Sequence, residues 1–175
     1  MTDQAMYVVE TNSAAATYAW GQMLGKLLPI PMVVALQGEL GAGKTLLTQG
    51  LAAGLGITSG VTSPTFVFVN EYALPNGNLL IHIDSYRLGA SVDVAVSEAF
   101  TFGLEEILTR PDAIVVIEWA ELVAPLLPAD HLHIALHHQP DDPTHRRLVC
   151  MAHGPLSHRL LQQMRLADPL YQAVN

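Results

Sequence analysis

The chain has 175 residues, of which 50% are apolar and 14% are charged, so it can form the core of one globular domain and is not a disordered chain. We therefore expect a single domain over residues 1–175. Its net charge of −8 excludes a protein that binds DNA or RNA alone through the phosphate backbone, so any contact with nucleic acid is expected to run through another subunit.

The sequence indicates a cytoplasmic location. The single cysteine, Cys150, cannot form an internal disulfide, which fits a reducing compartment and a buried apolar role. The start of the chain lacks the basic and apolar stretches of a secretory signal. No apolar run approaches the roughly 20 residues that span a bilayer, so we expect no membrane segment.

Apolar strands rich in β-branched residues alternate with helices along the chain. The expected helices cover residues 13–28, 44–55, 92–108, 119–127 and 156–166. The expected strands cover residues 32–37, 66–69, 79–83, 113–117, 131–137 and 147–151. Turn residues at Asn76-Gly77 and around Pro143 predict antiparallel hairpins, whereas the fully apolar strands 32–37 and 113–117 are typical of a parallel sheet.

A glycine-rich loop joins the strand 32–37 to the helix 44–55. It reads Gly38-Glu39-Leu40-Gly41-Ala42-Gly43-Lys44-Thr45 and matches the phosphate-binding pattern G-x-x-x-x-G-K-[ST]. Glycines let successive N–H groups turn toward a phosphate, and the next helix directs its positive end at the same anion. We expect Lys44 to reach the β and γ phosphates and Thr45 to bind Mg²⁺. The alternative is a structural glycine turn.

This motif in its context predicts an α/β domain of the P-loop NTPase type, with a largely parallel central sheet, flanking helices and antiparallel hairpin additions. Two acids, Asp84 and Glu118, directly follow expected strands and would emerge beside the loop. There they would hold Mg²⁺ or orient the attacking water, unless they are merely exposed carboxylates. The spacing does not decide between the two roles, but the uniformly apolar strand before Glu118 favours Glu118 as the metal-side acid.

Four further motifs follow the loop in order. They are Ser63-Pro64-Thr65-Phe66, His82-Ile83-Asp84-Ser85-Tyr86-Arg87-Leu88, Gly103-Leu104-Glu105-Glu106 and Glu118-Trp119. Together they closely resemble the TsaE family, small bacterial ATPases required to make threonylcarbamoyladenosine at position 37 of tRNAs. The resemblance covers roughly residues 11–121. It implies an ATPase that acts on the TsaD and TsaB subunits, with TsaC supplying the activated threonylcarbamoyl group, and that does not itself modify the base.

The resemblance also implies residue roles. It places Lys44 and Thr45 at the phosphate and Mg²⁺ positions, Asp84 and Glu118 at the essential acids, Trp119 beside the nucleotide, and Ser63 and Thr65 on a switch-like loop. A hydroxyl in such a loop could bind the γ-phosphate or its metal and release it after hydrolysis. Leu46 departs from the family, since many members have a second hydroxyl residue there.

Several alternatives stay open at this point. The chain could be a small-molecule kinase of the shikimate-kinase type, or a nucleotide-gated binding module with little hydrolysis. Arg87 could be an arginine finger or part of a structural ion pair, and Trp119 could pack on the base or cover the sheet. Because no clear cationic finger emerges, we expect weak activity alone and stimulation by partners.

Seven of the eight histidines lie between His131 and His158. His131, His133 and His137 share strand parity, from which a metal site could be drawn. Without cysteine or carboxylate partners at ligand spacing, solvent-facing histidines are the favoured interpretation.

Overall fold

The computed structural model describes residues 6–64, 68–89, 91–139 and 141–168. Seven strands form one sheet in the order β1-β7-β6-β2-β5-β4-β3. They are β1 (Met6–Thr11), β2 (Met32–Gln37), β3 (Val69–Ala73), β4 (Leu79–Asp84), β5 (Ala113–Glu118), β6 (Leu132–Gln139) and β7 (Asp142–Ala152). The central strands β6, β2, β5 and β4 pair in parallel, while β7, β1 and β3 add antiparallel edges. The α/β fold expected from the sequence is confirmed.

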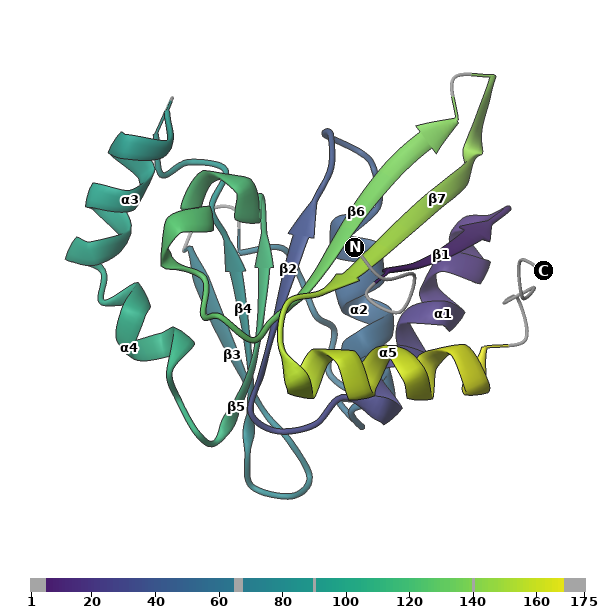
Figure 1. Cartoon of the computed structure of the whole chain (residues 1–175), viewed down its shortest axis with the longest axis horizontal. Coiled ribbons are helices and arrows are strands. Elements are labelled where there is room, and N and C mark those ends of the chain that lie inside the picture. Colours follow the sequence, from purple (N-terminus) through teal and green to yellow (C-terminus); the bar gives the residue numbers. More distant parts are fainter. Residues whose placement is uncertain (1–5, 65–67, 90, 140, 169–175) are drawn as a thin grey trace.

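Helices cover both faces of this sheet (Figure 1). One face carries α1 (Ala14–Leu27), α2 (Lys44–Gly54) and α5 (Pro155–Ala167), and the other carries α3 (Val92–Thr101), α4 (Leu104–Leu108) and the 3₁₀ helix η2 (Ala120–Leu126). Alternate residues of β2 serve the two layers, because successive side chains of a strand point to opposite faces. Val34 and Leu36 join the core under α1 and α2, whereas Val33 and Ala35 join the core under α3.

The two helices α1 and α2 approach each other so closely that their backbones touch. A Cβ on Gly50 of α2 would fall on the carbonyl oxygen of Tyr18, and a Cβ on Gly25 of α1 would fall on that of Leu51. Ser13 caps α1, because its hydroxyl accepts a hydrogen bond from the N–H of Ala16. This close packing fixes α2, the helix that follows the glycine-rich loop.

Several details differ from the sequence prediction. Strand β7 already begins at Asp142, so Pro143 lies in the strand and not in the expected turn. The strand β1 was not expected, and it pairs with β7 while burying Tyr7 and Val9. The first strand of the β3–β4 hairpin runs over Val69–Ala73 rather than 66–69, and residues 65–67 lie outside the described part. The expected helix 92–108 is two helices, because Gly103 adopts a left-handed φ of 71° between them.

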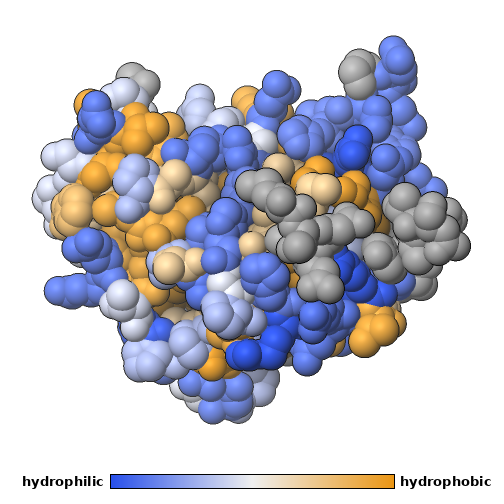
Figure 2. Space-filling model, in the orientation of Figure 1, coloured by the Kyte–Doolittle hydropathy of each residue, from blue (hydrophilic) through white to orange (hydrophobic). Residues whose placement is uncertain are grey.

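Apolar side chains gather on the side of the molecule formed by α3 and α4 (Figure 2). The exposed large hydrophobic residues of this segment are Val92, Val94, Phe100 and Phe102. Cys150 is buried in the opposite core layer, as expected, and burial raises the pKa of its thiol. Within the described ranges, no helix is long and apolar enough to cross a membrane.

Candidate functional site

The loop between β2 and α2 holds the lysine of the motif in a defined position. Gly43 is the N-terminal cap of α2 and has a φ of 104°, a left-handed conformation that favours glycine. The Lys44 ammonium donates hydrogen bonds to the carbonyl oxygens of Gly38 at 2.6 Å and Glu39 at 2.9 Å. The lysine side chain therefore turns back over its own loop, at the N-terminal end of α2, where the first backbone N–H groups have no partner within the helix.

The two candidate acids lie side by side at the ends of neighbouring parallel strands. Asp84 of β4 is in register with Glu118 of β5. The Thr45 hydroxyl donates a hydrogen bond to Glu118 Oε2 at 3.0 Å, and the Ser63 hydroxyl donates one to Asp84 Oδ2 at 3.1 Å. The structure thus brings each acid against one of the predicted hydroxyl residues. Thr65, the other residue of the predicted switch loop, lies outside the described residues.

Trp119 follows Glu118 and lies over the lysine. Its backbone is left-handed, with a φ of 58°, and the Lys44 ammonium lies 3.9 Å from the centroid of its ring. The ring of Tyr86 lies 5.0 Å away, tilted by 45°. Burial lowers the pKa of Lys44, while the negative charges of nearby carboxylates, Glu118 foremost, act in the opposite direction. The lysine therefore sits in an enclosed and partly acidic environment.

These groups share one open cavity of about 460 Å³. It is lined by residues of the glycine-rich loop, by Leu46 and Tyr86, by the predicted site residues Lys44, Thr45, Ser63, Asp84, Glu118 and Trp119, and by Arg146. Leu46 therefore presents an apolar surface at the position where many family members have a hydroxyl. The predicted site residues that the structure describes come together in one place, although they come from four separate parts of the chain.

Arg146 of β7 is a site residue that the sequence did not reveal. Its Nε donates a hydrogen bond to the carbonyl oxygen of Ala42 at 3.0 Å, and its Nη1 donates one to Thr144 at 2.9 Å. The β6–β7 hairpin thus delivers a cation to the glycine-rich loop. Arg87, which the sequence offered as a candidate finger, is exposed and is not among the residues that line the cavity.

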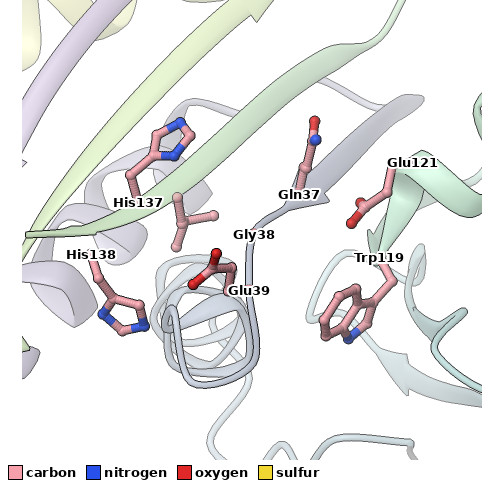
Figure 3. Close-up of a pocket in the computed structure, with 8 residues that line it drawn as sticks. Gln37, Gly38, Glu39, Trp119, Glu121, His137 and His138 are labelled. Atoms are coloured by element: carbon pink, nitrogen blue, oxygen red, sulfur yellow. The ribbon is translucent and has the colours of Figure 1, made fainter. Parts of the chain in front are cut away.

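A smaller cavity of about 340 Å³ shares Trp119 with the first and is also lined by Gly38 (Figure 3). The side chains of Glu39 and His138 lie on one side of the β2 end, and those of Trp119 and Glu121 on the other. Glu121 Oε2 is buried without a hydrogen-bond partner among the described residues, and burial raises the pKa of this carboxyl. Glu121 was also missed from the sequence, since it lies past the end of the strand.

A third missed residue is His82. It is fully buried in β4, and its Nε2 lies 2.8 Å from Glu118 Oε1. The sequence did carry a signal, because a lone imidazole interrupts the otherwise apolar run 79–83.

The C-terminal histidines do not form a metal site within the described part of the chain. The ring of His131 stacks on that of His153 with centroids 4.2 Å apart, and His133 Nε2 lies 3.0 Å from Gln37 Oε1. Against the prediction of solvent-facing side chains, His131 and His133 are half-buried, while His137 is exposed as expected.

Comparison with known proteins gives a consistent result. Residues 11–148 match the family model described as threonylcarbamoyl adenosine biosynthesis protein TsaE. The chain is 46% identical to the tRNA threonylcarbamoyladenosine biosynthesis protein TsaE of Synechocystis, covering 65% of this chain and 69% of the relative. It is 36% identical to that of Bacillus subtilis, covering 78% and 79%. The crystal structure of Bacillus subtilis YdiB superposes with a TM-score of 0.75 at 29% identity, covering 92% of this chain and 95% of that one.

Proposed function

Because the chain belongs to the TsaE family of tRNA threonylcarbamoyladenosine biosynthesis, we propose that it is the Mg²⁺-dependent ATP-hydrolysing component of that process. In this proposal it serves the modification of position 37 by acting on a TsaD–TsaB complex and contacts tRNA only through that complex. The observation that carries the proposal is the hydrogen bond between Thr45 and Glu118 beside Lys44. The family match favours this function over the small-molecule kinase.

The loop has the shape that a polyphosphate needs. A Cβ on Gly38 would lie 2.7 Å from the carbonyl oxygen of Leu136, and Gly43 has a left-handed φ of 104°, so both positions favour glycine. With no side chains in the way, backbone N–H groups at the start of α2 are available to phosphate oxygens. Lys44 would bind the same phosphates with an ammonium that two carbonyls already orient.

The oxygen atoms beside the loop fit magnesium. Thr45 offers a hydroxyl and Glu118 a carboxylate, which are the hard oxygen donors that Mg²⁺ prefers. When bound, Mg²⁺ would neutralise charge on the phosphates and on the leaving group. Asp84, one strand further from the loop, would then accept a hydrogen bond from the attacking water and orient it. This division leaves Glu118 as the metal-side acid and Asp84 as the water-side acid.

The contact between Ser63 and Asp84 supports a switching role for the segment before β3. The Ser63 hydroxyl is held by the very carboxylate that would orient water. A nucleotide that competes for either group would release Ser63, so the segment could report the nucleotide state to a partner. Thr65 keeps its predicted role in this segment as a proposal only.

The exposed apolar surface of α3 and α4 supports a protein partner, since contiguous apolar patches on soluble proteins often mark interaction sites. If the TsaD–TsaB complex binds there, Phe100→Ser will reduce stimulation of ATP hydrolysis by that complex without changing the unstimulated rate. Leu166→Ser is the matched control, because Leu166 is equally apolar and 91% exposed on α5. Equal stimulation of both variants would exclude this surface.

Phosphate release from ATP tests the proposed activity, measured with and without Mg²⁺ and with added TsaD and TsaB. Glu118→Gln and Asp84→Asn should still bind ATP but release phosphate at least about tenfold more slowly. Glu71→Gln, an exposed carboxylate on β3, is the control and should behave like the unsubstituted protein. Unchanged turnover in either site variant would remove that acid from the mechanism, and transfer of phosphate to a small acceptor would favour the kinase.

A further inference from the structure

The buried imidazole of His82 touches the carboxylate that faces the glycine-rich loop. His82 is 0% exposed, and its Nε2 lies 2.8 Å from Glu118 Oε1. Glu118 is itself only 3% exposed, and its other oxygen, Oε2, accepts the hydrogen bond from Thr45. The two oxygens of one carboxylate therefore have different partners, one inside the sheet and one at the cavity.

The chemistry of this contact fixes the proton on one nitrogen. A carboxylate only accepts hydrogen bonds, so His82 Nε2 must carry the hydrogen and donate it. His82 Nδ1 is buried and has no hydrogen-bond partner among the described residues, so the contact of Nε2 with Glu118 is the hydrogen bond that orients the ring. His82 therefore contacts Glu118 through a hydrogen on Nε2.

We propose that His82 is a positioning residue that holds Glu118 Oε1 inside the sheet and so presents Oε2 to Thr45 and to a magnesium ion. This inference rests on the proposed function. The terminal torsion of a glutamate is broad, so a carboxylate without a fixed partner samples several orientations. Hydrogen-bond partners that orient a metal ligand typically contribute 10- to 100-fold in metal affinity or activity. His82 performs this task from the strand next to Glu118, where the parallel pairing of β4 and β5 places it.

Two amide substitutions test the role of the Nε2 donor. The amide nitrogen of glutamine reaches about as far as histidine Nε2, whereas that of asparagine ends near the position of Nδ1. His82→Gln should therefore keep the Mg²⁺ dependence of ATP binding within a few-fold of the unsubstituted protein. His82→Asn should raise the Mg²⁺ concentration needed for half-maximal ATP affinity by about 10- to 100-fold. Both variants bury a neutral amide, so similar stability is expected for the two. Thermal unfolding checks this and separates a misplaced Glu118 carboxylate from a loss of folded protein.

Equal Mg²⁺ dependence in the Gln and Asn variants would overturn the proposal. If neither variant folds, the ¹⁵N spectrum of the unsubstituted protein decides instead: a hydrogen on His82 Nε2 supports the role, and an Nε2 without a hydrogen contradicts it. Failure of the proposed function looks different, because the unsubstituted protein would then show no effect of Mg²⁺ on ATP binding at all.

Discussion

The Lys44 ammonium lies against the face of the Trp119 ring, 3.9 Å from its centroid. Such a contact is worth about 0.5–2 kcal/mol, depending on how far water is excluded. The ring covers the lysine of the phosphate-binding loop. Trp119 therefore lies where the phosphates, rather than the base, of a nucleotide are expected. This geometry adds a third possibility to packing on the base or merely covering the sheet.

We expect Trp119→Leu to weaken binding of ATP with Mg²⁺ by about 0.5–2 kcal/mol, because the ammonium loses the aromatic face that holds it. Trp119→Phe keeps an aromatic face, so its ATP affinity should lie between those of Trp119→Leu and the unsubstituted protein. Isothermal calorimetry measures both variants. If Trp119→Leu binds ATP as tightly as the unsubstituted protein, the ring does not support Lys44 in the bound state.

Arg146 is expected to contribute to ATP binding from β7. Its guanidinium holds the loop carbonyl of Ala42 and lines the same cavity as Lys44, so Arg146→Ala removes both a loop contact and a positive charge. A hydrogen bond to a charged group contributes about 1.5–3 kcal/mol, which corresponds to a loss of roughly 10-fold or more in ATP affinity. Arg147→Ala, at the exposed neighbouring position, is the matched control and should change little.

The close contact of α1 and α2 predicts a large effect from one methyl group. Gly50→Ala should destabilise the fold by about 1–3 kcal/mol, because the new Cβ meets the carbonyl oxygen of Tyr18 and the helices must separate. Urea unfolding gives the free energy. Gly60→Ala is the control, since no atom lies within 4 Å of a Cβ there, and it should stay within about 0.5 kcal/mol of the unsubstituted protein. An unaffected Gly50→Ala would mean that the helices can part freely.

The half-buried histidines predict a loss of stability in mild acid. Burial lowers the pKa of both His131 and His133 below 6.5, so in the window beneath 6.5 the unfolded chain binds more protons than the folded one. The stability that these two neutral histidines allow is therefore fully present above about pH 7. The free energy of unfolding then decreases as the pH falls through their lowered pKa values. A melting series from pH 7.5 to pH 5 should show a shallower decline for the double variant His131→Gln, His133→Gln, with His137→Gln as control. If the melting temperatures of the double variant and the unsubstituted protein fell equally with pH, these two histidines would not be the cause of the acid sensitivity.

The sequence predicted the centre of the molecule well, because local signals and burial agree there. The β2 strand, the glycine-rich loop and α2 follow from apolar runs and from glycines that need unusual backbone angles. The site acids follow for the same reason: Asp84 and Glu118 end parallel strands, and parallel pairing brings such ends together.

The sequence failed where a position depends on partners far along the chain. β1 alternates buried Tyr7 and Val9 with more exposed neighbours, but its strand exists only through pairing with β7. Arg146 reaches the loop only because the β6–β7 register places it opposite His138. The helix break at Gly103 depends on a left-handed backbone angle. An isolated glycine in a helical pattern does not specify such an angle.

Binding of ATP to two lysine variants tests the central claim most directly. The chain has only two lysines, Lys44 in the loop and the exposed Lys26 near the end of α1, so Lys26→Ala is an exact charge match for Lys44→Ala. With calorimetry in the presence of Mg²⁺, the unsubstituted protein and Lys26→Ala should bind ATP alike, whereas Lys44→Ala should show no measurable binding. Undiminished affinity in Lys44→Ala would mean that the triphosphate does not lie in the loop before α2, and the proposed ATPase would fail with it.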